Sequence, residues 1–204
     1  MKTKTINLYQ FEEITDQEIK DRIIEKNRDI NTEYDWSDFI IEDAQEQLKE
    51  IGFMEPEIYF SGFHSQGDGL CFDCSYIDLL KVIPHIEKNF LKKHNITKNR
   101  LKIISEYCDF LIYKNSYANH YSHEKTHYID ISSETSIFKG KYLKIEQIVD
   151  YIKDCIEELR VSLCREYYKQ LNDEYDYRMS DKSIEETLIS NEYYFDLETL
   201  EIEG

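Results

Sequence analysis

The stretch Ile58-Tyr59-Phe60-Ser61-Gly62-Phe63-His64-Ser65-Gln66-Gly67-Asp68-Gly69-Leu70-Cys71-Phe72 decides the fold of this chain. Large apolar residues alternate with smaller or polar ones at both of its ends, which is the period of a β-strand with one buried face. Between these ends, Gly67-Asp68-Gly69 supplies the positive-φ freedom that a tight turn needs. The pattern predicts a β-hairpin at the centre of an antiparallel sheet.

Further periodic segments surround this hairpin. Alternating residues predict a second strand pair at 109–114 and 128–132, and short strands near both ends of the chain at 6–11 and 193–195. Apolar residues at helical spacing predict helices, which we place at about 15–28, 36–51, 97–107, 143–171 and 181–190. The economical interpretation is one α+β domain over residues 1–204, with several helices covering the sheet.

Local signals place the ends of several helices. Thr15 with Glu18 resembles a capping box that opens the first helix, and Ser180 caps the helix at 181–190. Gly52 is expected to end the second helix. The inner stripe of that helix is expected to contain five apolar residues, namely Phe39, Ile40, Ala44, Leu48 and Ile51.

The charge of the chain is strongly negative, with 42 acidic residues against 25 Lys and Arg and a net charge of −17. Residues 10–57 carry −11 and residues 140–204 carry −9, whereas residues 58–139 carry +1. Contacts with nucleic-acid phosphates need Lys and Arg, so direct binding of nucleic acid is not expected unless a local basic face exists. The acidic ends are either solvated helical faces that favour solubility, or a surface for a basic partner.

The five cysteines are an odd number without the spacing of a secreted disulfide scaffold. The N-terminal residues lack the apolar run of a signal peptide, and no stretch approaches the ~18 apolar residues of a membrane span. We therefore expect a soluble, cytoplasmic protein with reduced thiols and no membrane partner.

No residue pattern predicts a catalytic or metal site. His120, His123 and His127 have a spacing that could hold a transition metal on a helix, but the segment resembles strand and loop, so exposed loop histidines are expected. Cys71 and Cys74 lack a second cysteine pair and are expected to be small packing residues. No carboxylate pair stands out as a general acid and base, and no cofactor is expected.

Two regions combine exposed-type aromatic and acidic residues, a pairing that suits protein interfaces because tyrosine gives contact area and carboxylates steer the partner. One is the turn of the central hairpin, and the other follows the long helix. The expected contact residues are Phe63, His64, Gln66, Asp68, Glu174, Tyr175, Asp176, Tyr177, Glu185 and Glu186.

Several motifs resemble a known family. They are Leu8-Tyr9-Gln10-Phe11-Glu12-Glu13-Ile14-Thr15-Asp16, then Tyr34-Asp35-Trp36 with Ile41-Glu42-Asp43-Ala44, the run Ile58 to Phe72, and Ser180-Asp181 with Asn191-Glu192-Tyr193. Together they resemble small acidic proteins of phages and prophages labelled "antitoxin of toxin-antitoxin stability system". The resemblance covers most of the chain, but it covers residues 78–130 and the middle of the long helix only weakly. It implies a mobile-element origin and a non-catalytic binding role, similar to that of anti-CRISPR and other anti-defence proteins.

These observations lead to one main hypothesis and two alternatives. The chain is expected to be a non-catalytic phage or prophage inhibitor that binds a bacterial nucleic-acid-handling protein, either a CRISPR effector or other defence nuclease, or a toxin. The first alternative is a small metal-dependent hydrolase or nuclease that uses His120, His123, His127 and carboxylates. The second is a structural accessory protein that forms homo-oligomers.

Overall fold

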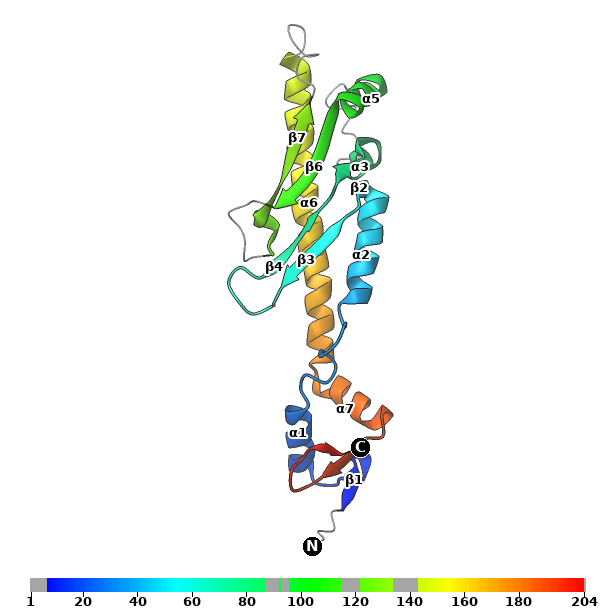
Figure 1. The fold of residues 1–204 in the computed structure, drawn as a ribbon, viewed down its shortest axis with the longest axis vertical. Helices are drawn as coiled ribbons and strands as arrows, with labels where there is room; N and C mark the ends of the chain where they lie inside the picture. Colours follow the sequence, from blue (N-terminus) through cyan, green and yellow to red (C-terminus); the bar gives the residue numbers. More distant parts are fainter. Residues whose placement is uncertain (1–6, 87–91, 93–95, 115–121, 134–142, 204) are drawn as a thin grey trace, which may run out of the picture. The chain divides into compact units, whose positions relative to one another are not determined.

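A computed structural model describes residues 7–86, 92, 96–114, 122–133 and 143–203 (Figure 1). The chain packs as two compact units. Unit 1 comprises residues 1–38 and 171–204, and unit 2 comprises residues 39–170. The class is α+β, as the sequence predicts, with a long helix near the C-terminal end.

Unit 2 is built from two β-hairpins and the helices around them. Its elements are α2 (Asp38–Ile51), β2 (Phe53–Met54), β3 (Glu57–Ser61), β4 (Gly69–Asp73), β5 (Tyr76–Ile77), α3 (Leu79–Ile86), α5 (Lys98–Tyr107), β6 (Cys108–Lys114), the 3-10 turn η2 (Glu124–Thr126), β7 (His127–Ser133) and α6 (Leu143–Arg178), whose last eight residues belong to unit 1. Figure 1 shows α6 running behind the strands of this unit.

The central hairpin forms in the predicted place. β3 and β4 are antiparallel, with Ile58 opposite Phe72 and Phe60 opposite Leu70. The second predicted pair, β6 and β7, is also antiparallel, and a bridge between Cys74 and Ile112 connects the two hairpins. The strands form several small sheets instead of one continuous sheet. Pro56, which has no N–H to donate, separates the β2–β5 ladder from the β3–β4 ladder.

The core of unit 2 lies between the hairpins and the helices. The rings of Phe53 and Phe72 meet edge to face with centroids 5.2 Å apart. The apolar stripe of α6 is buried in unit 2 at Val149, Ile152, Ile156, Leu163 and Tyr167. In α2 the prediction holds for Ala44 and Leu48 but is wrong for Phe39, which is 81% exposed because it lies in the first turn of the helix, ahead of the buried stripe.

Unit 1 joins the two ends of the chain. It contains β1 (Leu8–Gln10), the 3-10 turn η1 (Phe11–Glu13), α1 (Gln17–Lys26), α7 (Asp181–Ser190), β8 (Tyr194–Asp196) and β9 (Ile202–Glu203). The strands follow the order β1-β8-β9, and Tyr9 lies opposite Phe195. The buried core has eight residues, namely Phe11, Ile14, Ile23, Ile24, Ile184, Leu188, Phe195 and Leu200.

The helix caps follow the sequence signals with one correction. Ser180 caps α7 through its hydroxyl group, as expected, and the Thr97 hydroxyl caps α5. The cap of α1 is Asp16 and not Thr15, because the Asp16 carboxylate accepts hydrogen bonds from the backbone N–H groups of Glu18 and Ile19. A carboxylate at this end of a helix also interacts favourably with the helix dipole. In the part of the chain that the structure describes, no helix is long and apolar enough to cross a membrane.

Candidate functional site

The turn of the β3–β4 hairpin is held by its own polar groups. The Asp68 carboxylate accepts hydrogen bonds from the backbone N–H of His64 at 3.0 Å and of Ser65 at 2.6 Å, and Gly67 has a φ of +101°. Gly69 does not have a positive φ. Its lack of a side chain allows the backbone of His123 to lie close to it, because a Cβ there would lie 3.2 Å from the Cα of His123.

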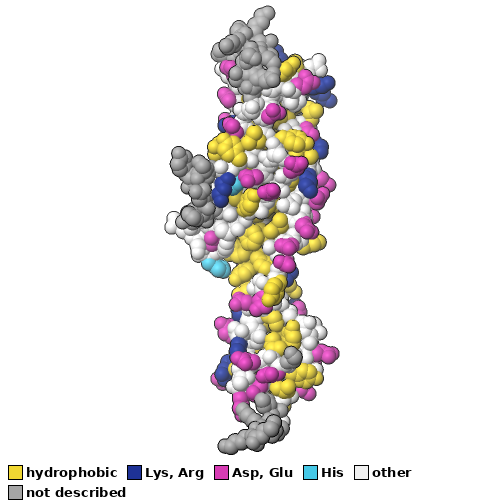
Figure 2. Space-filling view, viewed as in Figure 1, with side chains coloured by type: hydrophobic (Ala, Val, Ile, Leu, Met, Phe, Trp, Pro, Cys, Tyr) yellow, Lys and Arg dark blue, Asp and Glu magenta, His cyan; other side chains and the backbone are white. Residues whose placement is uncertain are grey.

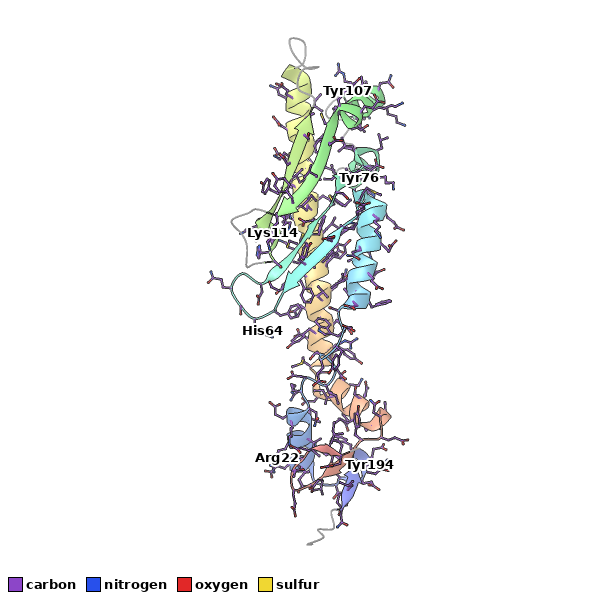
Figure 3. All side chains as sticks on the ribbon, viewed as in Figure 1. Arg22, His64, Tyr76, Tyr107, Lys114 and Tyr194 are labelled. Atoms are coloured by element: carbon purple, nitrogen blue, oxygen red, sulfur yellow. The ribbon has the colours of Figure 1, made fainter. Side chains whose placement is uncertain are left out.

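The base of this turn is anchored to α6. The Tyr168 hydroxyl donates to the carbonyl oxygen of Gly62 at 2.7 Å, and the Phe63 ring lies between the rings of Phe60 and Tyr168, with centroids 6.1 and 5.5 Å away. Of the four contact residues predicted in the turn, Phe63 and Asp68 therefore stabilise the turn itself. His64 and Gln66 are exposed, and Figure 3 shows His64 at the outer end of the hairpin.

The predicted contact residues after the long helix lie in unit 1, at the end of α6 and on α7. Glu174 pairs with Arg178 at 2.7 Å, and the Tyr175 ring packs against Trp36 with centroids 5.7 Å apart. Asp176 and Tyr177 are exposed, the latter at 53%.

Asp173, on the same part of α6, is also exposed. It precedes Asp176 by three residues and Tyr177 by four, so the three side chains share one face of the helix. On α7, Glu186 is exposed and Glu185 is half-buried. Asp173 was not among the predicted contacts, although the helical spacing could have identified it.

Negative charge is concentrated in unit 1. Its 72 residues contain 21 Asp and Glu against 8 Lys and Arg, a net charge of −13. Unit 2 contains 21 against 17, a net charge of −4. Figure 2 shows magenta carboxylate side chains on the visible face of unit 1. The acidic segment 10–57 is divided between the two units at Asp38.

A buried arginine is the main polar feature of unit 2. Arg160 on α6 has a fully buried side chain whose guanidinium donates to the carbonyl oxygens of Glu124 at 2.6 Å and His127 at 3.2 Å. It also forms a salt bridge with Glu157 at 2.5 Å. One carboxylate therefore neutralises the guanidinium charge, and the backbone carbonyls of Glu124 in η2 and His127 in β7 gain a strong donor. This arrangement supports the η2 turn structurally.

His127 lies beside this arginine and is also buried, so the expectation of an exposed loop histidine is wrong for this residue. The Thr126 hydroxyl donates to the carbonyl oxygen of His123 at 2.7 Å and contacts Nδ1 of the His127 ring at 2.9 Å. Nε2 faces the Asp73 carboxylate at 3.0 Å. Neither of these two buried atoms has an aligned hydrogen-bond partner among the described residues.

The surroundings of His127 disfavour its charged form. Burial, together with the positive charges of Arg160 and Lys114, lowers the pKa of His127 to about 4. Burial and the neighbouring Glu57 raise the pKa of Asp73 above its usual value. At neutral pH the ring of His127 is therefore uncharged, and its 3.0 Å contact with Asp73 is not an ion pair.

We expect the free energy of unfolding to fall as the pH falls from 6.5 to 4 because of His127, by at most about 1.4 kcal/mol per pH unit. In this window His127 is protonated in the unfolded chain but neutral in the folded chain. The stabilisation that neutral His127 contributes is therefore complete above pH 6.5 and is lost as the pH falls to 4. Urea midpoints measured against pH should show the slope in the parent chain and a flatter profile in His127→Gln. Equal slopes in the parent and this variant would contradict the assignment.

The cysteines and histidines of the described residues are the remaining reactive side chains. Cys71, Cys74, Cys108 and Cys164 are buried, and burial raises the pKa of the Cys74 and Cys164 thiols to about 12, so these thiols remain protonated. Within the described residues, no three His, Cys, Asp or Glu side chains lie close enough to hold a metal ion. His120 lies outside the described residues, so the three-histidine alternative stays a prediction.

Comparison with known proteins gives a family but no activity. Neither the curated proteins nor the solved structures include a match to the chain. A family model described as "Domain of unknown function (DUF8835)" matches residues 36–181. This range includes all of unit 2, with both hairpins and the buried arginine, and leaves β1, α1, β8 and β9 of unit 1 outside. Because the match spans more than half of the sequence, the chain belongs to the DUF8835 family.

Proposed function

We propose that this chain is a non-catalytic inhibitor that binds a bacterial nucleic-acid-handling protein, such as a CRISPR effector, another defence nuclease or a toxin, by covering a basic surface. The observation that carries the proposal is the net charge of −13 in the 72 residues of unit 1. A protein surface that holds nucleic acid is rich in Lys and Arg, and a dense set of carboxylates is complementary to it.

The side chains that remain exposed in unit 1 suit this role. Asp173, Asp176 and Tyr177 share a face of α6, and Glu186 is exposed on α7. Tyrosine supplies contact area at low entropic cost, while the carboxylates increase the association rate. Glu174 and Tyr175 support this face from inside through Arg178 and Trp36 and are not assigned to the contact.

We expect the immobilised chain to retain a nucleic-acid-handling protein from a bacterial lysate at about 150 mM salt, where charges more than ~8 Å apart are screened and close contacts must hold the complex. The variant Asp173→Asn/Asp176→Asn/Glu186→Gln should lose this protein, identified by mass spectrometry. The control Glu42→Gln/Glu50→Gln/Glu166→Gln removes three exposed carboxylates from unit 2 and should retain it. If parent and both variants retain the same proteins, unit 1 is not the contact surface.

A further inference from the structure

The charge of the chain reverses sign in one segment. Residues 81–102 contain seven Lys and Arg and a single acidic residue, Glu87, which gives +6 within a chain of −17. A local basic face is the condition under which an acidic protein can still contact phosphates, because these contacts depend on nearby cations and not on the total charge. The question is whether the cations of this segment are exposed and available.

The described cations of the segment lie on the surface of unit 2. Lys81 is on α3, Lys98, Arg100 and Lys102 are on α5, and Lys92 lies between these helices in the sequence. All five are exposed, and α3 packs against α5. We call these five residues the basic pole. In Figure 2, dark-blue side chains mark the margin of unit 2 at the level of α5.

Within the described residues, several cations of unit 1 form salt bridges with carboxylates, whereas most cations of the basic pole do not. In unit 1, Lys26, Arg28 and Arg178 all form salt bridges with carboxylates. Lys81, Lys98 and Arg100 form none with another residue in the described ranges, and Lys102 only approaches Glu106 at 3.9 Å. Among the described residues, therefore, no carboxylate pairs with Lys81, Lys98 or Arg100.

Helix stability does not explain these residues. Lys98 and Arg100 lie in the first turn of α5, where acidic residues are absent. A positive charge there opposes the helix dipole and costs about 0.3–1 kcal/mol. Selection for stability would place acidic residues at these positions, so an intermolecular role is the simpler explanation.

Exposed aromatic rings accompany the cations. Tyr76 in β5, just before α3, is 50% exposed, and Tyr107 at the end of α5 is 38% exposed. Figure 3 labels both rings in the part of unit 2 that holds α3 and α5. Cations that follow a phosphate backbone, together with rings on which bases stack, are the features with which proteins bind single-stranded nucleic acid.

We propose that the basic pole binds single-stranded nucleic acid. Lys81, Lys98 and Arg100 contact the phosphates, and Tyr76 and Tyr107 offer stacking surfaces to unpaired bases. The site goes beyond the inhibitor function proposed for unit 1, because it would contact the nucleic acid of a target complex while unit 1 contacts the protein. It also departs from the expectation that whole-chain charge excludes direct binding.

Fluorescence anisotropy of a labelled 15-nucleotide oligo(dT) at 100 mM NaCl tests the phosphate contacts. The parent should bind, with a slope of log Kobs against log[salt] of about −2 for three contacts. Lys81→Gln/Lys98→Gln/Arg100→Gln should bind at least tenfold more weakly. The control Arg22→Gln/Lys49→Gln/Lys169→Gln has the same net charge and should bind within about twofold of the parent. No binding by the parent, or equal losses in both triple variants, would overturn the proposal.

A second pair of variants tests the stacking. Tyr76→Ala/Tyr107→Ala should weaken oligo(dT) binding about tenfold, and Tyr76→Phe/Tyr107→Phe, which keeps both rings, should preserve it. A duplex of the same length should bind more weakly than the single strand. Equal affinity for duplex and single strand, with no effect of the alanine pair, would overturn the single-strand assignment.

Sedimentation velocity without nucleic acid addresses the competing partner, the acidic unit 1 of a second copy. Salt-sensitive self-association that the pole variant abolishes, with no oligonucleotide binding, would assign the basic pole to that contact and overturn the proposal. None of these assays contains a protein target, so a negative result would leave the inhibitor function of unit 1 standing.

Discussion

Arg160→Met is expected to lower the free energy of unfolding by about 3–5 kcal/mol, because the substitution removes one partner from a buried charged network. Methionine keeps most of the side-chain volume, so the loss comes from the hydrogen bonds. The carbonyl oxygens of Glu124 and His127 would remain buried without their donor. Urea denaturation followed by far-UV circular dichroism measures the change.

Two further variants sharpen this experiment. Arg160→Lys keeps the charge, but the lysine ammonium lacks the planar fork with which arginine reaches both carbonyls and Glu157. This variant should therefore retain only a minor part of the stability that is lost in Arg160→Met. Lys169→Met, at an exposed position on the same helix, should change stability by less than about 0.5 kcal/mol. A loss below about 1 kcal/mol in Arg160→Met would show that water or neighbouring groups satisfy the carbonyls, and our account of the network would be wrong.

Gly52→Ala is expected to destabilise the chain by about 3 kcal/mol or more, for two reasons that act together. Gly52 ends α2 with a φ of +120°, a conformation that side chains disfavour by about 1–3 kcal/mol. An added Cβ would also lie 2.8 Å from the carbonyl oxygen of Asp78, and the backbone of Asp78 is held by its own hydrogen bond to the Gly52 carbonyl at 2.8 Å. The clash is with backbone, which cannot rotate away.

Gly62→Ala is the matched control. A Cβ at Gly62 would meet only the Asp68 carboxylate, at 3.0 Å or more, and a side chain can shift by a few tenths of an ångström. We expect a loss below about 1 kcal/mol there, measured by the same denaturation. If the two glycine variants are equally stable, close packing between the end of α2 and the start of α3 is less restrictive than the distances indicate.

The parts of the fold that the sequence predicts are those with local causes. The alternation of residues 58–72 predicts the pairing of β3 with β4, and the helical spacing of apolar residues predicts α6. The Ser180 hydroxyl predicts where α7 begins. The predictions are wrong for Phe39, which lies off the buried face of α2, and for the cap of α1, which is Asp16 and not Thr15. In both places two neighbouring residues of suitable chemistry compete, and tertiary packing decides between them.

The candidate sites were less predictable, because the role of a polar residue depends on contacts made by distant segments. Asp68 and Phe63 resemble exposed turn residues in sequence, but one binds the turn backbone and the other packs on Tyr168 from α6. The burial of Arg160 was predictable from the sequence, because it lies four residues after Ile156 on the apolar stripe of α6. A lone arginine at such a position indicates a buried charge that must find carbonyls and a carboxylate.

The pairing of β1 with β8 has a consequence for the order in which the chain folds during synthesis. Leu8 lies opposite Asp196, so unit 1 cannot close until residue 196 has left the ribosome. Unit 2 is continuous in sequence and can fold earlier, once Arg160 has emerged to bind the carbonyls near residue 124. Until β8 arrives, Phe11 and Ile23 have no partner strand or helix to cover them, and the nascent N-terminal segment depends on its acidic side chains to stay apart from other chains.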